Sequence, residues 1–273
     1  MSVAQQRLRL RYGGDEHVPE MACTALIEQL LDHRSVRAYL PDAVSEAMLA
    51  AIIAAAQSAA SSSNLQAWSV VAVREPATRA ALAECAGGQS HMLEAPLQLV
   101  WLADLARLAR LGEQTERPVE ALDYTEMLLV GVIDAALAAQ NAAAAAESLG
   151  LGTVYIGGLR NQPETVATLL ALPAGVIAVF GMCVGYPDPA RPAAVKPRPP
   201  QSVVLHHEQY SLSAQDEGIA SYNAAMADFY AAQQMKVRGK WADHSAKRIA
   251  GPHTLSGRDR LVDALHARGF KLK

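Results

Sequence analysis

The sequence predicts an α+β fold in which a central, mainly antiparallel sheet is flanked by helices. Segments with helical spacing of apolar residues outnumber the short β-branched segments, and the two kinds are mixed along the chain. The run at 177–184 is apolar almost throughout, as expected of a strand buried on both faces. The chain has 273 residues, of which 51% are hydrophobic and 19% charged, which is the composition of a globular protein with a sizeable core.

The elements are expected in mixed order along the chain. The predicted strands are 68–73, 97–102, 154–156 and 177–184, with an edge or exchanged strand at 203–206. The predicted helices are 24–31, 45–59, 78–86, 123–149, 163–170 and 213–232. Pro and Gly punctuate 107–120, which predicts a mobile loop, and 190–200 is a Pro-rich excursion. Residues 1–22 are interpreted as an N-terminal extension, and residues 23–273 as one domain.

The helix at 123–149 is the longest and most apolar element. Its Ala-rich second half suits close approach of another helix, in the core or at a dimer interface. Asp134, Gln140 and Asn141 interrupt the apolar run, so a buried helix is favoured over a membrane span. A hydrogen bond to another helix is the role favoured for Asp134. The N-terminus lacks the apolar core of a signal peptide, which favours a cytoplasmic location.

Charge and cysteine usage exclude several classes. The net charge is −3, yet residues 236–273 carry ten Lys and Arg against three Asp. Trp241 and Phe270 are the only aromatic residues of this basic tail, too few for a base-stacking platform, so nucleic-acid binding is not expected. The three cysteines are far apart and form no metal-binding pattern, so each is expected to be a small core residue.

Two short cationic strings are the first candidate for a binding site. The string 33–37 contains His33, Arg34, Ser35 and Arg37, and the string 196–198 contributes Lys196 and Arg198. Arginine suits phosphate oxygens because its fork is planar, donor-only and always charged. A solvated helix end is the alternative for either string alone.

Other short motifs are weak when taken singly. Gly157-Gly158 after a strand lets a flat ligand approach the backbone, although an ordinary turn is the alternative. The serine run 61–63 either offers hydroxyls to a ligand or simply ends a helix. Gln89 follows a glycine turn, and His206-His207 lacks a carboxylate at metal spacing, which favours a surface strand. No Rossmann or P-loop fingerprint is present.

Taken together and in this order, the motifs resemble the flavin-dependent nitroreductase superfamily. The similarity is greatest to its branch of oxygen-insensitive NADPH nitroreductases and NADPH-flavin oxidoreductases. The matching segments are 33–37, 61–66, 87–91, 139–141, 147–152, 155–161, 180–185 and 196–198. The resemblance implies a nitroreductase-like sandwich, an intertwined homodimer with exchanged C-terminal segments, and FMN bound at the dimer interface.

The resemblance also implies which residues hold FMN. His33, Arg34, Ser35 and Arg37 would bind the phosphate and ribityl end, joined by Lys196 and Arg198. Gln89, Tyr155, Gly157 and Gly158 would lie near the ring system. The partner subunit would contribute Ser61, Ser62 and Ser63. No side chain is assigned as catalytic and no metal is expected, because the flavin carries the chemistry.

NADPH is the co-substrate that this branch implies. Its 2′-phosphate requires a cation, for which the basic tail offers Arg238 and Lys240. The implied reaction is two-electron, ping-pong hydride transfer from NADPH through the flavin to a nitroaromatic, a quinone or free flavin. Two alternatives are a flavin reductase that supplies a partner oxygenase and a flavin-binding regulatory module without turnover. Neither a membrane nor a nucleic acid is an expected partner.

Overall fold

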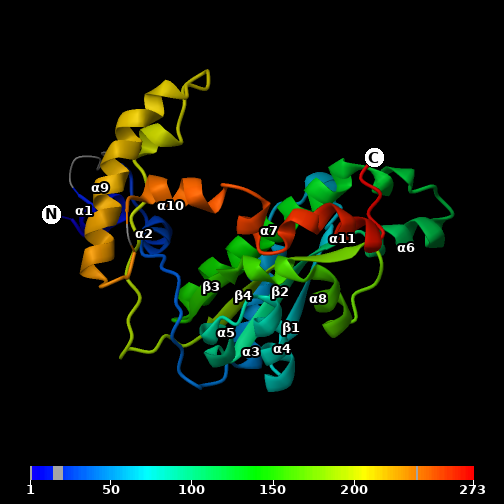
Figure 1. Ribbon diagram of the computed structural model, residues 1–273. Helices are drawn as coiled ribbons and strands as arrows, with labels where there is room; N and C mark the ends of the chain where they lie inside the picture. The colour runs from blue at the N-terminus through cyan, green and yellow to red at the C-terminus, as the bar shows by residue number, and fades with distance from the viewer. Residues whose placement is uncertain (1, 15–20, 238) are drawn as a thin grey trace. The chain divides into compact units, whose positions relative to one another are not determined.

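The computed structural model of the chain describes residues 2–14, 21–237 and 239–273. The strands are β1 (Trp68–Val73), β2 (Leu97–Asp104), β3 (Gly152–Ile156) and β4 (Val176–Gly185). The helices are α1 (Val3–Tyr12), α2 (Ala25–Leu31), α3 (Glu46–Gln57), α4 (Pro76–Cys85), α5 (Ser90–Glu94), α6 (Ala106–Thr115), α7 (Thr125–Ser148), α8 (Pro163–Leu169), α9 (Asp216–Ala232), α10 (Trp241–Arg248) and α11 (Leu261–Ala267). Short 3-10 turns join several of them (Figure 1).

The chain forms two compact units. The first consists of Met1–Arg34 and Ala193–Thr254, and the second of Ser35–Pro192 and Leu255–Lys273. The first unit therefore contains α1, α2, α9 and α10, and the second contains the sheet with the remaining helices. The boundary between the units falls inside the cationic string 33–37.

The second unit is built on a four-stranded antiparallel sheet in the order β1-β2-β4-β3. The strands predicted at 68–73, 97–102, 154–156 and 177–184 are all present as β1, β2, β3 and β4. Strand β1 begins and ends as predicted. A bulge between Trp101 and Leu102 shifts the pairing of β2 with β4. The predicted α+β class, with an antiparallel sheet flanked by helices, is confirmed.

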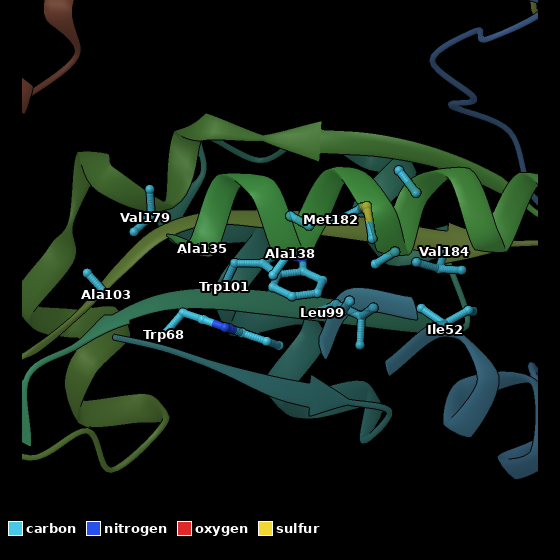
Figure 2. Packing of buried hydrophobic residues seen from close by; sticks show 14 of the residues in the cluster. Ile52, Trp68, Leu99, Trp101, Ala103, Ala135, Ala138, Val179, Met182 and Val184 are labelled. Carbon is cyan, nitrogen blue, oxygen red and sulfur yellow. The ribbon is translucent and has the colours of Figure 1, made fainter. Parts of the chain in front are cut away.

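The core lies between the sheet and α7, which crosses one face of it (Figure 1). Trp101 and Leu99 project from β2 toward the alanines of α7, and Trp68 packs against Trp101 with ring centroids 5.7 Å apart (Figure 2). Alternate residues of β2 face the opposite side, where Gln98 donates to the carbonyl of Met92 on α5. Both central strands are therefore buried on both faces, as predicted for β4.

Helix α7 is a core helix of this unit. By length and hydropathy it is the one described helix that would suit a membrane span. Its alanines at 135, 138, 139 and 142 are fully buried against the sheet and α3, and the carboxylate of Asp134 is buried with them. The prediction of a buried helix is confirmed. The expected helix–helix hydrogen bond of Asp134 is wrong, because its partners lie in the turn that follows α3.

The prediction of a mobile loop at 107–120 is wrong, because most of this segment is α6. Gly112, which suggested a loop, is required by packing: a Cβ there would lie 2.2 Å from Cγ1 of Val119. The chain therefore folds back on the helix after Glu116, and the amide of Arg117 donates to the Gly112 carbonyl at 2.9 Å. Arg107 ties the start of α6 to the carbonyl of Gln66 at 2.6 Å.

The prediction of a strand at 203–206 is also wrong. Gln201–Val203 is a 3-10 turn, and the segment after it forms no ladder. Val203 packs against α9 beside Gly218, whereas Val204 and Leu205 are exposed. The adjacent pair His206-His207 lies in this irregular segment rather than in a surface strand, and the ring of His206 packs on Tyr210 with centroids 4.6 Å apart.

Candidate functional site

The serine turn, residues 61–66, is organised by one buried carboxylate. Asp134 is 1% exposed, and its Oδ2 accepts hydrogen bonds from the Ser61 hydroxyl at 2.7 Å and from the Ala67 amide at 3.0 Å. Its Oδ1 accepts from the Ser62 amide at 3.2 Å. The Ser61 oxygen in turn accepts from the Gln66 amide at 2.8 Å. The hydroxyl proton of Ser61 is therefore used in the hydrogen bond to Asp134.

The backbone of this turn is unusual. Ser63, Asn64 and Gln66 have φ of 48°, 55° and 51°, in the left-handed region that non-glycine residues rarely adopt. Such strain persists where the surroundings determine the conformation, and here Asp134 supplies that constraint. The side chains of Ser62 and Ser63 are left exposed at the surface of the turn.

The second half of the first cationic string lies along β3. Ser35 forms a parallel bridge with Thr153, and the Val36 amide donates to the Thr153 carbonyl at 2.9 Å. The Tyr39 hydroxyl donates to the Val36 carbonyl at 2.7 Å and is buried. Arg37 is exposed, and its guanidinium donates only weakly, at 3.4 Å, to the Ser35 carbonyl. The backbone of Arg37 thus lies in the segment that runs beside β3, and its side chain is exposed.

The glycine turn after β3 packs directly on the turn that carries Gln89. A Cβ on Gly158 would lie 2.7 Å from the carbonyl oxygen of Ala86, so only glycine allows this approach. The side-chain amide of Gln89 donates a hydrogen bond to the same Ala86 carbonyl at 3.0 Å. The structure thereby brings Gln89, Gly157 and Gly158 together in the second unit.

Tyr155 projects from β3 next to this turn. Its ring meets Phe180 edge to face, with centroids 5.3 Å apart, and its hydroxyl donates to the Gln140 side chain at 3.4 Å. Burial raises the pKa of Tyr155 well above its ordinary value, so the phenol is protonated at neutral pH.

Within the first unit, Arg11 joins the start of the string 33–37 to the string 196–198. Arg11 of α1 donates to the His33 carbonyl at 2.7 Å and to the Lys196 carbonyl at 3.0 Å, and its own carbonyl accepts from the Arg198 amide at 2.7 Å. Lys196 is half-buried, with its ammonium 6.0 Å from the centroid of the Phe229 ring. His33, Lys196 and Arg198 are therefore fixed relative to each other through their backbones.

The arginines of both strings form no ion pair within 2–14, 21–237 and 239–273. Arg34, Arg37 and Arg198 are exposed, and their guanidinium groups donate only to nearby backbone carbonyls. By contrast, Arg191, Arg260, Lys271 and Lys273 have carboxylate partners. Each of these guanidinium forks offers the donors that a phosphomonoester requires.

The predicted NADPH residues are only partly described. Arg238 lies outside the described residues. Lys240 is exposed immediately before α10, where its amide donates to Asp243 at 3.0 Å. Cys85 and Cys183 are buried, which confirms the prediction that they are core residues, whereas the prediction is wrong for Cys23, which is partly exposed. No cluster of metal-ligating side chains occurs in the part of the chain that the structure describes.

The sequence did not reveal the roles of Arg11 and Asp134, which hold the backbone of the candidate site segments in place. Arg11 lies in a polar segment without apolar periodicity, so nothing local marked it. Asp134 was noticed as a polar interruption, but its partners lie 67 to 73 positions away. A charged residue inside an otherwise apolar helix was the available signal.

An antiparallel α+β fold and exposed arginines that pair with no carboxylate of the described residues suit a protein with an anionic ligand. A model of the nitroreductase family matches residues 30–186, and a model of the C-terminal domain of that family matches residues 196–273. The chain belongs to the nitroreductase family.

Individual relatives are similar over nearly their full length. The oxygen-insensitive NADPH nitroreductase of Salmonella typhimurium is 39% identical over 245 residues, which cover 89% of this chain and 97% of that protein. The NADPH-flavin oxidoreductase of Vibrio harveyi is 40% identical with the same coverage. The solved structure of an NADPH:FMN oxidoreductase from Vibrio harveyi, complexed with NAD⁺, superposes with a TM-score of 0.80 at 36% identity, covering 92% of this chain and all of that one.

Proposed function

We propose that this protein is an FMN-dependent NADPH oxidoreductase that reduces nitroaromatics, quinones or free flavin. The observation that carries the proposal is the similarity, at 39–40% identity over 97% of their length, to two NADPH-dependent reductases. The unneutralised arginines of the two cationic strings support it, since FMN is a phosphomonoester. Residues 23–273 would form the FMN-binding domain, preceded by the extension 1–22.

The residues present fit FMN. The phosphate and ribityl end would be held by His33, Arg34, Ser35, Arg37, Lys196 and Arg198, and the ring would lie near Gln89, Tyr155, Gly157 and Gly158. When bound, FMN would supply two-electron redox chemistry between NADPH and the acceptor. The protein itself supplies charge and orientation: the arginine forks attract and hold the phosphate, and the glycine turn offers backbone amides without a side chain in the way.

We propose a homodimer built on α7. Leu129, Ile133 and Leu137 lie four residues apart along α7 and are 50%, 54% and 44% exposed, so they form an apolar stripe on its outer face. The turn bearing Ser62 and Ser63 is fixed to the same helix by Asp134. A partner docked on this stripe would receive these serines near its own FMN. A cytoplasmic location accompanies this proposal, since NADPH is an intracellular reductant.

The visible spectrum of the purified protein tests the proposal. We expect a flavin spectrum in the protein as isolated or after addition of FMN, and rapid bleaching when NADPH is added anaerobically. A protein that remains colourless with added FMN would contradict the proposal. A bound flavin that NADPH does not bleach would instead favour a regulatory flavin-binding module.

The acceptor is identified by comparing steady-state rates. Rates with a nitrofuran, a quinone and free FMN are measured at equal NADPH concentration. A preference for the nitrofuran or the quinone supports a reductase acting directly on its substrate. A strong preference for free FMN would favour the alternative in which reduced flavin is delivered to a partner oxygenase.

A further inference from the structure

Helix α1 lies ahead of the region that the family models match, which begins at residue 30. Despite its polar sequence it is a well-formed helix. Ser2 and Gln5 form a capping box at its start, and Gly13 ends it with φ of 75°. Leu8 is 2% exposed, so the helix contributes to the core of the first unit. It is therefore an integral part of that unit.

Two arginines attach α1 to its surroundings in different ways. Arg7 pairs with the carboxylates of Glu28 and Asp32 on and just after α2. Arg11 is 7% exposed and donates to the backbone carbonyls of Leu31 at 2.6 Å, His33 at 2.7 Å and Lys196 at 3.0 Å. One guanidinium thus joins two chain segments that are about 160 residues apart in the sequence.

The segments that Arg11 joins are those that carry the candidate phosphate ligands. These hydrogen bonds are to backbone carbonyls, so they fix the main chain at His33 and Lys196. The Arg11 carbonyl accepts from the Arg198 amide at 2.7 Å, which fixes the third cationic residue as well. The Tyr222 hydroxyl adds a bond of 3.2 Å to the Pro197 carbonyl between them. Together these bonds fix the backbone at His33, Lys196 and Arg198 within the first unit.

We propose that Arg11 is a positioning residue for the FMN phosphate, and that α1 is a brace that lies ahead of the region matched by the family model. This inference rests on the proposed function, in which the cationic strings hold FMN. Arg11 does not touch the phosphate. It preorganises the groups that do, so that less order must be imposed when the ligand binds.

The predicted consequence is a selective loss of phosphate recognition. Riboflavin has the same ring and ribityl chain as FMN but no phosphate, so the ratio of their affinities isolates the phosphate contribution. Apoprotein of the full chain is titrated with each ligand, and quenching of flavin fluorescence gives the two dissociation constants. For Arg11→Met we expect the FMN dissociation constant to rise by about tenfold or more, with riboflavin affinity changing by about threefold at most.

Arg7→Met is the matched control, because it removes the same charge from the same helix but takes no hydrogen bond from the carbonyls of Leu31, His33 and Lys196. Its FMN-to-riboflavin ratio should stay within about twofold of wild type. Arg11→Lys keeps the charge but loses the fork, and should give an intermediate ratio; it also serves if Arg11→Met fails to fold. Equal weakening of both ligands in the Arg11 variants, or an unchanged ratio, would overturn the inference while leaving the proposed function intact. A wild-type protein that binds neither flavin would overturn both.

Discussion

Asp134 of α7 accepts a 2.7 Å hydrogen bond from the hydroxyl of Ser61, 73 residues earlier in the chain. The same carboxylate accepts from the amides of Ser62 and Ala67, so it satisfies three donors at the surface of the core. The turn it holds contains three residues with positive φ. A single buried charge therefore links the long core helix to the segment expected to reach the partner's cofactor.

Asp134→Asn should destabilise the protein by about 2–4 kcal/mol, because an amide cannot accept all three hydrogen bonds and directs its own donors at other donors. FMN affinity should fall as well, since the serine turn loses its fixed conformation. Denaturant unfolding and FMN titration measure the two effects. The matched control is Glu126→Gln, an exposed neutralisation in the first turn of the same helix, for which a change of about 0.5 kcal/mol at most is expected. Equal stabilities of the two variants would contradict the role assigned to Asp134.

Gly158→Ala should disturb the cofactor site by overpacking. The new methyl group would lie 2.7 Å from the Ala86 carbonyl, so the glycine turn must move away from the turn that carries Gln89. We expect a loss of about 1–3 kcal/mol in stability and weaker flavin binding. Thermal unfolding and the flavin content of the purified variant test this. Gly14→Ala is the control, because a Cβ there meets no atom of the described residues within 4 Å, and both quantities should stay unchanged.

Tyr155→Phe should leave the pH–rate profile unchanged between about pH 6 and 9. Burial raises the pKa of the Tyr155 phenol above its ordinary value of about 10, so its protonation state is constant over that range. Its 3.4 Å hydrogen bond to Gln140 is long, and removing it should lower stability by about 1 kcal/mol at most. Tyr155→Ala also removes the ring from Phe180 and should lower stability by about 3 kcal/mol. A pH profile that shifts in the phenylalanine variant would indicate that the phenol transfers a proton.

Local patterns in the sequence were sufficient for most of the fold. The β-branched run at 68–73 and the apolar run at 177–184 specify β1 and β4 because strands buried in a sheet are marked by composition. The prediction of a loop at 107–120 is wrong because Gly112 and Pro118 are residues typical of loops, whereas most of the segment is α6. In the structure Gly112 makes room for Val119, a contact that no local rule anticipates.

The order of the motifs and the resemblance predict candidate site residues, and those assignments stay predictions; the polar residues that hold the backbone of these segments leave no such pattern. Arg11 reaches Lys196, 185 residues away, and Asp134 reaches Ser61, 73 residues away. Both connections depend on how distant segments meet in three dimensions, and neither leaves a periodic pattern in the chain. Polar residues that contact a ligand can be found by motif, whereas polar residues that hold the ligand-binding backbone must be found in the structure.

His91 should make stability depend on pH. It is 8% exposed, its Nε2 has no partner among the residues that the structure describes, and burial, with Arg37 nearby, lowers its pKa. The unfolded chain therefore binds a proton more readily, and stability should decline as pH falls below about 6.5, the ordinary value for histidine. His91→Phe removes this titration, so its stability relative to wild type should increase from about pH 8 to pH 5.5. Denaturant unfolding at both pH values measures the difference, with the exposed His253→Phe as the control for a general effect of losing a histidine. A constant difference between His91→Phe and wild type would mean that His91 is protonated as readily in the folded protein as in the unfolded one.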